Sequence, residues 1–155
     1  MTKKHRILST IPAIIIMIVI FYFSHQEAAD SSKLSGGIVN NIFNLIERIF
    51  SFDLPIGERD YWLEILETIL RKAAHMAEYG LLAAAVSFSF YVYEKRNSAL
   101  ILWSEAVTVL YAATDEFHQL FVLGRSGQVS DILIDGIGAM IGCVLFYFVC
   151  KKFTL

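Results

Sequence analysis

The amino-acid sequence predicts an all-α membrane protein with four transmembrane helices and an extracytoplasmic amphipathic helical segment between the first two spans. Hydrophobic residues make up 56% of the 155-residue chain and charged residues only 18%, whereas soluble domains average about 25% charged residues. Four stretches are long and apolar enough to cross a bilayer, which takes about 20 helical residues. The basic residues gather in the connections that four spans would place on one side of the membrane. The length predicts a single domain, residues 1–155.

The first predicted span covers residues 7–23 and carries Pro12 in its first turns. Basic residues precede it, so a cleaved signal peptide is the competing interpretation. A membrane span is favoured because the apolar core is long and no small-residue cleavage site follows it directly. The three later spans are predicted at residues 73–93, 99–122 and 132–149. Residues 24–72 are then the long connection between the first and second spans.

The predicted topology follows from the basic residues of the short connections, which are enriched on the cytoplasmic side of membrane proteins. Seven of the thirteen Lys and Arg residues would lie on one side: Lys3, Lys4, Arg6, Lys95, Arg96, Lys151 and Lys152. The connection between the third and fourth spans has only Arg125. Both termini are therefore predicted to be cytoplasmic, and residues 24–72 to lie outside.

The long connection has the pattern of two helices. Apolar residues recur at helical spacing at Leu34, Ile38, Ile42, Leu45, Ile46 and Ile49. After a break at Pro55, Asp60 can cap a second helix in which Glu67 and Arg71 can pair one turn apart. No Pro or Gly separates this helix from the second span, so the two can form one long helix. We expect the amphipathic stretch to lie on the membrane surface or to cover the helix bundle, with simple packing against the spans as the alternative.

The outward-facing ends of the predicted spans carry many polar residues. Polar residues occur at the start of span two, at the end of span three and at the start of span four, and Ser24–Gln26 follows the end of span one. An ionisable side chain at the centre of a membrane helix costs about 2.5–3.5 kcal/mol, so these groups are expected to face the bundle and find partners. Gly138 and Gly142 continue the stripe of Asp135, and they are expected to let a neighbouring helix approach closely.

Two roles are predicted for the cluster. The catalytic candidates combine histidines with carboxylates, which suit general acid–base chemistry, and are His75, Glu78, Asp115, Glu116 and His118. The binding candidates are Arg71, Lys72, Tyr79, Gln119, Arg125, Asp131 and Asp135. The alternative is that these groups only hold the helices together. Interhelical hydrogen bonds average about 0.6 kcal/mol, which is a weak reason for so many charges.

Charge narrows the range of ligands. Five carboxylates against three basic side chains leave the predicted cluster net acidic, which disfavours an anionic head group. A divalent metal ion would balance the charge, with histidines and carboxylates as ligands, although the spacing matches no zinc signature. The net charge of −2 gives no basic surface for nucleic acid. Cys143 and Cys150 are predicted to pack as small apolar residues, and no nucleophile elbow, P-loop or dinucleotide motif is present.

The spacing of the polar residues resembles that of the VanZ-like family of small multi-span bacterial membrane proteins. The resemblance rests on Lys72-x-x-His75-x-x-Glu78-Tyr79, on Asp115-Glu116-x-His118-Gln119, and on Gly124-Arg125 followed by Asp131, Asp135 and Gly138. It extends from about Phe21 to Cys143, except for the linker from Leu34 to Asp60. The name-giving member of this family is associated with resistance to the glycopeptide teicoplanin. The resemblance implies a bacterial cell membrane, an extracytoplasmic site and a role in the envelope, without an established reaction.

Three functions fit these observations. The first is an envelope protein that lowers susceptibility to a membrane-anchored glycopeptide by binding or altering a membrane lipid or lipid-linked cell-wall component. The second is a membrane-embedded hydrolase or transferase that acts on an amphiphile through the histidines and carboxylates. The third is a small transporter or a scaffold without chemistry. A transporter is less favoured because the four predicted spans show no internal repeat.

Overall fold

The computed structural model describes residues 3–51 and 54–154, and every secondary-structure element in those ranges is an α-helix. The helices are α1 (Lys3–Ser9), α2 (Ile11–Ser24), α3 (Ala28–Phe50), α4 (Ile56–Val92), α5 (Asn97–Gln119) and α6 (Val129–Thr154). Pro12 lies in the first turn of α2, where the missing N–H of proline is tolerated. The predicted all-α class is therefore confirmed.

The most apolar helices are long enough to cross a membrane. Among the described residues, Lys3–Ser24 (α1 and α2) and Val129–Lys152 (in α6) pass this test by length and composition. They correspond to the first and fourth predicted spans. Most of the predicted spans 73–93 and 99–122 lies in α4 and α5, which end one residue and three residues before the predicted bounds, at Val92 and Gln119. Ionisable site residues lie inside both spans and lower their mean hydropathy. The chain thus has the helical character of a membrane protein, and the count of four spans stays a prediction.

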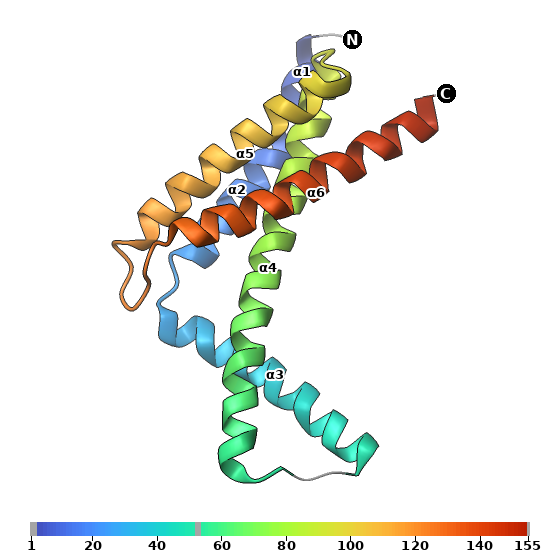
Figure 1. Ribbon diagram of the computed structural model, residues 1–155. Helices are drawn as coiled ribbons and strands as arrows, with labels where there is room; N and C mark the ends of the chain where they lie inside the picture. The colour runs from blue at the N-terminus through green and yellow to red at the C-terminus, as the bar shows by residue number, and fades with distance from the viewer. Residues whose placement is uncertain (1–2, 52–53, 155) are drawn as a thin grey trace.

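α4 is the longest helix of the described chain. Its 37 residues run without a break from the long connection into the second predicted span, so the prediction of one continuous helix is confirmed. At 1.5 Å per residue the helix is about 55 Å long, well beyond the roughly 30 Å of a hydrocarbon core. Figure 1 shows its first half projecting away from α5 and α6, with α3 crossing beside it.

The predicted start of this helix is wrong by one turn. α4 begins at Ile56, with Pro55 as its N-cap residue, and Asp60 lies inside the helix instead of capping it. Pro55 has an extended backbone, with φ of −53° and ψ of 142°, and no N–H that would need a partner. The helix can therefore start directly after the proline without a side-chain cap.

α3 packs along the first half of α4 and contacts no other helix of the described residues. Ser35 donates a hydrogen bond to Glu67 at 3.1 Å, and Arg71 donates to Ser32 at 3.2 Å. These contacts across the two helices replace the predicted Glu67–Arg71 pair, which is absent from the described part of the chain. The apolar stripe of α3 is exposed at Leu34, Ile38, Ile42, Leu45, Ile46 and Ile49. Packing against a neighbouring helix is therefore observed, and a place on the membrane surface stays a prediction.

α6 crosses α4 at close range because glycines lie at the contact. Gly138 and Gly142 of α6 face Met76 and Gly80 of α4, and a Cβ at either α6 glycine would overlap main-chain atoms of α4. The contact continues through the buried small residues Ala83, Ala139 and Cys143. The predicted close approach is confirmed, with the small-residue pattern that brings membrane helices together. Cys143 packs as a small buried residue, also as predicted.

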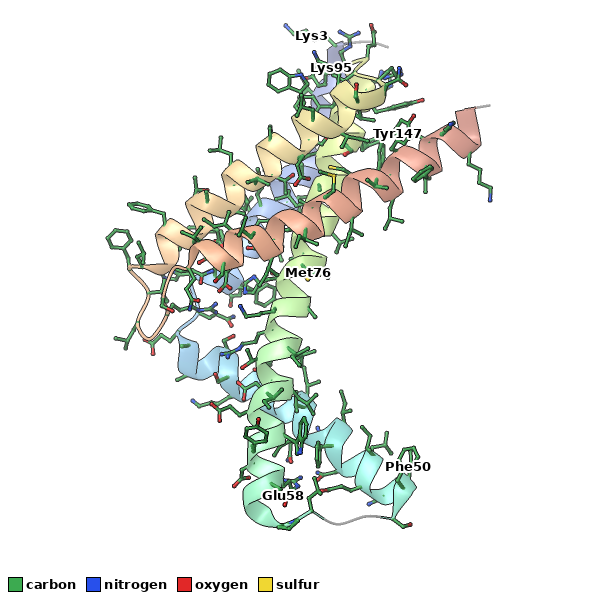
Figure 2. All side chains as sticks on the ribbon, in the orientation of Figure 1. Lys3, Phe50, Glu58, Met76, Lys95 and Tyr147 are labelled. Atoms are coloured by element: carbon green, nitrogen blue, oxygen red, sulfur yellow. The ribbon has the colours of Figure 1, made fainter. Side chains whose placement is uncertain are left out.

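The two ends of the bundle differ in the segments they contain. Figure 1 shows the N- and C-terminal ends of the chain near the turn between α4 and α5, with the α5–α6 loop at the opposite end of α5. An ion pair between Arg6 and Glu94 joins α1 to the α4–α5 turn. In Figure 2, Lys3 and Lys95 lie at this same end. The helix ends with the predicted site residues are therefore grouped at the other end.

Candidate functional site

The polar ends of the helices surround a cavity of about 360 Å³, which we call the polar cavity. Eight of the twelve predicted site residues line it: Arg71, Lys72, His75, Glu116, Gln119, Arg125, Asp131 and Asp135. In Figure 2, nitrogen and oxygen atoms gather between the middle of α4 and the adjoining ends of α2, α5 and α6. The volume lies at the low end of the roughly 300–1,000 Å³ of small-molecule sites. Residues far apart in the sequence thus form one site.

Sequence reasoning missed several polar residues that line this cavity, among them Ser31, Thr68 and Gln128. Thr68 lies one turn before Lys72 on the same face of α4, so helical spacing could have identified it. Ser31 belongs to the start of α3. No local pattern predicts it, because its place in the site depends on how α3 packs beside α4.

Asp115 lies behind the polar cavity and connects α5 to the end of α2. It is only 3% exposed, and its Oδ2 accepts hydrogen bonds from Ser24 of α2 at 2.7 Å and from Gln119 at 3.2 Å. Its Oδ1 is buried without a hydrogen-bond partner among the described residues, as is the hydroxyl of Tyr79 of α4. The end of span one therefore does meet the polar end of span three, through a side-chain hydrogen bond in the bundle interior.

Two further carboxylates of the site have partners in the cavity wall. Nζ of Lys72 lies 2.6 Å from Oδ1 of Asp131, which pairs α4 with the first turn of α6. Oε2 of Glu116 accepts a hydrogen bond from the main-chain N–H of Gln128 at 2.9 Å, which joins α5 to the residue before α6. Both contacts hold the start of α6 in position, and the Lys72 ammonium also offsets the negative charge of Asp131.

Arg125 ties the α5–α6 loop to the end of α2. Its Nε donates to the carbonyl oxygen of Gln26 at 3.1 Å, and its Nη2 donates to that of Phe23 at 3.3 Å. Gly124 precedes it with a φ of 75°, a left-handed conformation that glycine adopts without strain. Burial lowers the pKa of Arg125, but the guanidinium stays charged because arginine starts from a pKa above about 12. The wall therefore carries a positive charge held by neutral carbonyl groups.

The two predicted catalytic histidines lie in different places. His75 lines the polar cavity, and its Nδ1 lies 3.6 Å from Oε2 of Glu78, less than one turn further along α4. His118 does not line the cavity: its Nε2 is 3.3 Å from Nδ1 of His25, and its ring packs against Phe21. Asp115 bonds to Ser24, the residue before His25, so Asp115 and His118 both contact the end of α2, and only the carboxylate is fully buried.

A second cavity of about 260 Å³ adjoins the first, and we call it the apolar groove. Four residues line both: Ser31, Arg71, His75 and Arg125. Away from this junction the groove is lined mainly by apolar side chains, including Phe23, Leu34, Ile38, Leu70 and Ala74, with Glu78 also in its wall. The site is therefore amphipathic: a polar cavity and an apolar groove meet at these four shared side chains.

The charges that line the polar cavity balance. Three cations face three carboxylates there: Arg71, Lys72 and Arg125 against Glu116, Asp131 and Asp135. The sequence-based count was net acidic because it included Glu78 and Asp115, which do not line this cavity. Among the described residues, no three His, Cys, Asp or Glu side chains form a group that could hold a metal ion. The residues present thus do not fit the divalent cation considered as an alternative. Because the charges lining the cavity balance, it repels an anion less than the sequence-based charge count predicted.

The comparisons with known proteins agree with the sequence motifs. The VanZ/LLP1 family model matches residues 10–150, which is nearly the whole chain. The match includes every residue of the polar cavity and of the apolar groove. No curated protein and no solved structure matches the chain.

Proposed function

Since the chain belongs to the VanZ-like family, we propose that it is a multi-pass protein of the bacterial cell membrane that binds a lipid-linked component of the envelope. The observation that carries this proposal is the polar cavity, in which ionisable side chains from α4, α5, α6 and the α5–α6 loop meet. Ionisable residues in membrane helices are costly and commonly mark functional sites. An adjoining apolar groove is what an amphiphilic ligand would require.

The proposal includes a topology with four spans, cytoplasmic termini and an outward-facing polar cavity. It is supported by the grouping of both terminal ends with the basic α4–α5 turn at one end of the bundle (Figure 1). It is also supported by the positive-inside rule, because Lys95 and Arg96 lie in that turn. In this arrangement the first half of α4, with α3 beside it, extends from the outer face of the membrane.

We expect two matched serine-to-cysteine variants to react from opposite sides of the membrane. Both are made after Cys143 and Cys150 have been replaced by alanine. Ser126→Cys, in the α5–α6 loop, should react with a membrane-impermeant maleimide on intact cells. Ser98→Cys, at the start of α5, should react only after the cells are permeabilised. The reverse pattern, or equal reaction at both positions in intact cells, would contradict the proposed topology.

The proposed cellular role is lowered susceptibility to teicoplanin, and it can be tested with two glutamates of the same helix. Expression in a susceptible bacterium should raise the inhibitory concentration of teicoplanin. Glu78→Ala should abolish the increase because Glu78 lines the apolar groove beside His75. Glu58→Ala should retain it because Glu58 is exposed in the first turn of α4, remote from the site (Figure 2). Immunoblots must show equal membrane levels, and equal behaviour of the two variants would argue against the proposed role.

A membrane-embedded enzyme is the second candidate, favoured by the proximity of His75 and Glu78. Their separation of 3.6 Å is longer than a hydrogen bond, and a small movement of the Glu78 side chain on binding would bring the carboxylate close enough to orient the imidazole as a general base. Mass spectrometry of lipid recovered with the purified protein separates the two candidates. Unchanged lipid supports binding, whereas a cleaved or transferred product that disappears in His75→Ala supports hydrolase or transferase activity.

A further inference from the structure

Two cations of the site have no carboxylate partner, and this bears on the charge of the ligand. Among the described residues, neither Arg71 nor Arg125 forms an ion pair: Arg71 donates to the hydroxyl of Ser32, and Arg125 donates to two carbonyl oxygens. Lys72, by contrast, is paired with Asp131. A guanidinium has five N–H donors in a planar fork that matches the oxygens of a phosphate. Both arginines therefore keep donors available for an anion.

These two arginines lie at the junction between the polar cavity and the apolar groove, because both line both spaces. On one side of the junction the wall is polar. On the other side the groove continues between α3 and α4 along Leu34, Ile38, Leu70 and Ala74. Leu34 is 66% exposed and Ile38 is 47% exposed, so the groove opens beside the exposed apolar stripe of α3. A ligand that satisfies both parts must carry an anionic head and an apolar tail.

We propose that this site binds a lipid with a phosphate head group. The phosphate lies between Arg71 and Arg125, one acyl chain occupies the apolar groove between α3 and α4, and the remainder of the head group enters the polar cavity. The inference rests on the proposed lipid-binding function and specifies the class of lipid. It also gives a role to the first turns of α3, whose Ser31 and Leu34 are the polar and apolar parts of the same wall.

The carboxylates of the cavity do not oppose this assignment as strongly as their number suggests. Asp131 is neutralised by Lys72 at 2.6 Å, and Glu116 accepts the N–H of Gln128 at 2.9 Å. Asp115 is held behind the cavity by Ser24 and Gln119. Asp135, the third carboxylate of the polar cavity, is only 2% exposed, and it does not line the junction with the apolar groove. A phosphate at the junction would therefore meet the guanidinium groups of Arg71 and Arg125, which bond only to neutral oxygens among the described residues. Charge-assisted, bidentate hydrogen bonds are the strong contacts available to it there.

The test uses the full chain purified in detergent and native mass spectrometry with three probes: dioctanoyl phosphatidic acid, dioctanoylglycerol and inorganic phosphate. We expect phosphatidic acid to bind, and the other two to bind at least about tenfold more weakly. Arg71→Gln should lower the affinity about tenfold because it removes one fork at the junction. Ala74→Phe should do the same by filling the groove. Arg71 is the preferred site because Arg125 also anchors the loop.

Matched controls lie on the same helices. Ala73→Phe places the same ring on an exposed neighbour that lines neither space, and Arg48→Gln removes an exposed arginine of α3. Both should bind phosphatidic acid within about twofold of the wild type. No binding of phosphatidic acid by the wild type, equal binding of dioctanoylglycerol, or wild-type affinity in both Arg71→Gln and Ala74→Phe would overturn the inference. Equal binding of inorganic phosphate would also overturn it, because the site would then bind an anion without any contribution from an acyl chain.

This experiment and the teicoplanin assay fail independently. If the purified chain retains a neutral lipid in the same cavity and teicoplanin susceptibility still depends on Glu78, the phosphate head group is wrong and the proposed function stands. If phosphatidic acid binds as expected while expression leaves teicoplanin susceptibility unchanged, the lipid class is correct and the proposed cellular role is wrong.

Discussion

Gly142→Ala is expected to destabilise the folded protein by about 1–3 kcal/mol or more, although it adds a single methyl group. At this position a Cβ would overlap the main-chain oxygen of Gly80, and backbone atoms cannot move aside as a flexible side chain can. α6 and α4 would have to separate at their crossing, and overpacking of this kind typically costs about 1–3 kcal/mol. For a chain of this length the melting temperature should fall by about 2–10 °C.

The burial of Cys143 provides the measurement. This side chain is 1% exposed beside the crossing, so a thiol-reactive fluorescent dye reports unfolding in a Cys150→Ala background. Gly37→Ala is the matched control, because a Cβ at Gly37 meets nothing within 4 Å and alanine favours a helix over glycine by about 1 kcal/mol. Its melting temperature should stay the same or rise. Equal melting of the Gly142→Ala variant and the parent protein would show that the helices do not cross as closely as described.

The features that sequence predicted well are those set by local periodicity. Apolar and helical spacing located the helices, and the Gly138-x-x-x-Gly142 pattern predicted the close approach to α4. The positions of the basic residues predicted which helix ends would lie on the same side of the bundle, and the Ser24–Asp115 hydrogen bond joins two of those ends. These predictions succeed because a side chain on a regular helix has a direction that the sequence period determines.

The features that sequence did not predict depend on how one element packs on another. α3 turns Ser35, Val39 and Phe43 toward α4 and leaves the stripe from Leu34 to Ile49 exposed, and periodicity alone does not say which of these two faces packs. His118 and Asp115 lie three residues apart on α5, and both contact the end of α2 instead of lining the polar cavity. Their spacing predicts that they share a face of the helix, but it does not predict which neighbouring helix that face meets. The junction at Arg71 and Arg125 likewise exists only once the α5–α6 loop lies beside α4.

Asp115→Ala and Asp115→Asn should separate the structural role of this residue from its functional role. Asp115→Ala leaves the hydroxyl of Ser24 and the amide of Gln119 without their acceptor in the interior. An unpaired buried donor costs about 1–3 kcal/mol, so the melting temperature should fall by about 2–10 °C. Asp115→Asn keeps an oxygen acceptor for the two donors and should melt close to the wild type, within about 2 °C.

The same two variants give different results in cells if the carboxylate itself is needed. Asp115→Asn preserves the contacts that hold α2 to α5 but removes the acid, so a functional carboxylate predicts loss of the teicoplanin effect with normal stability and membrane levels. A purely structural Asp115 predicts that Asp115→Asn keeps the effect while Asp115→Ala loses it. We expect the first result. Asp115 is only 3% exposed and lies behind the polar cavity, and an ionisable side chain inside a membrane helix is costly and commonly marks a functional site.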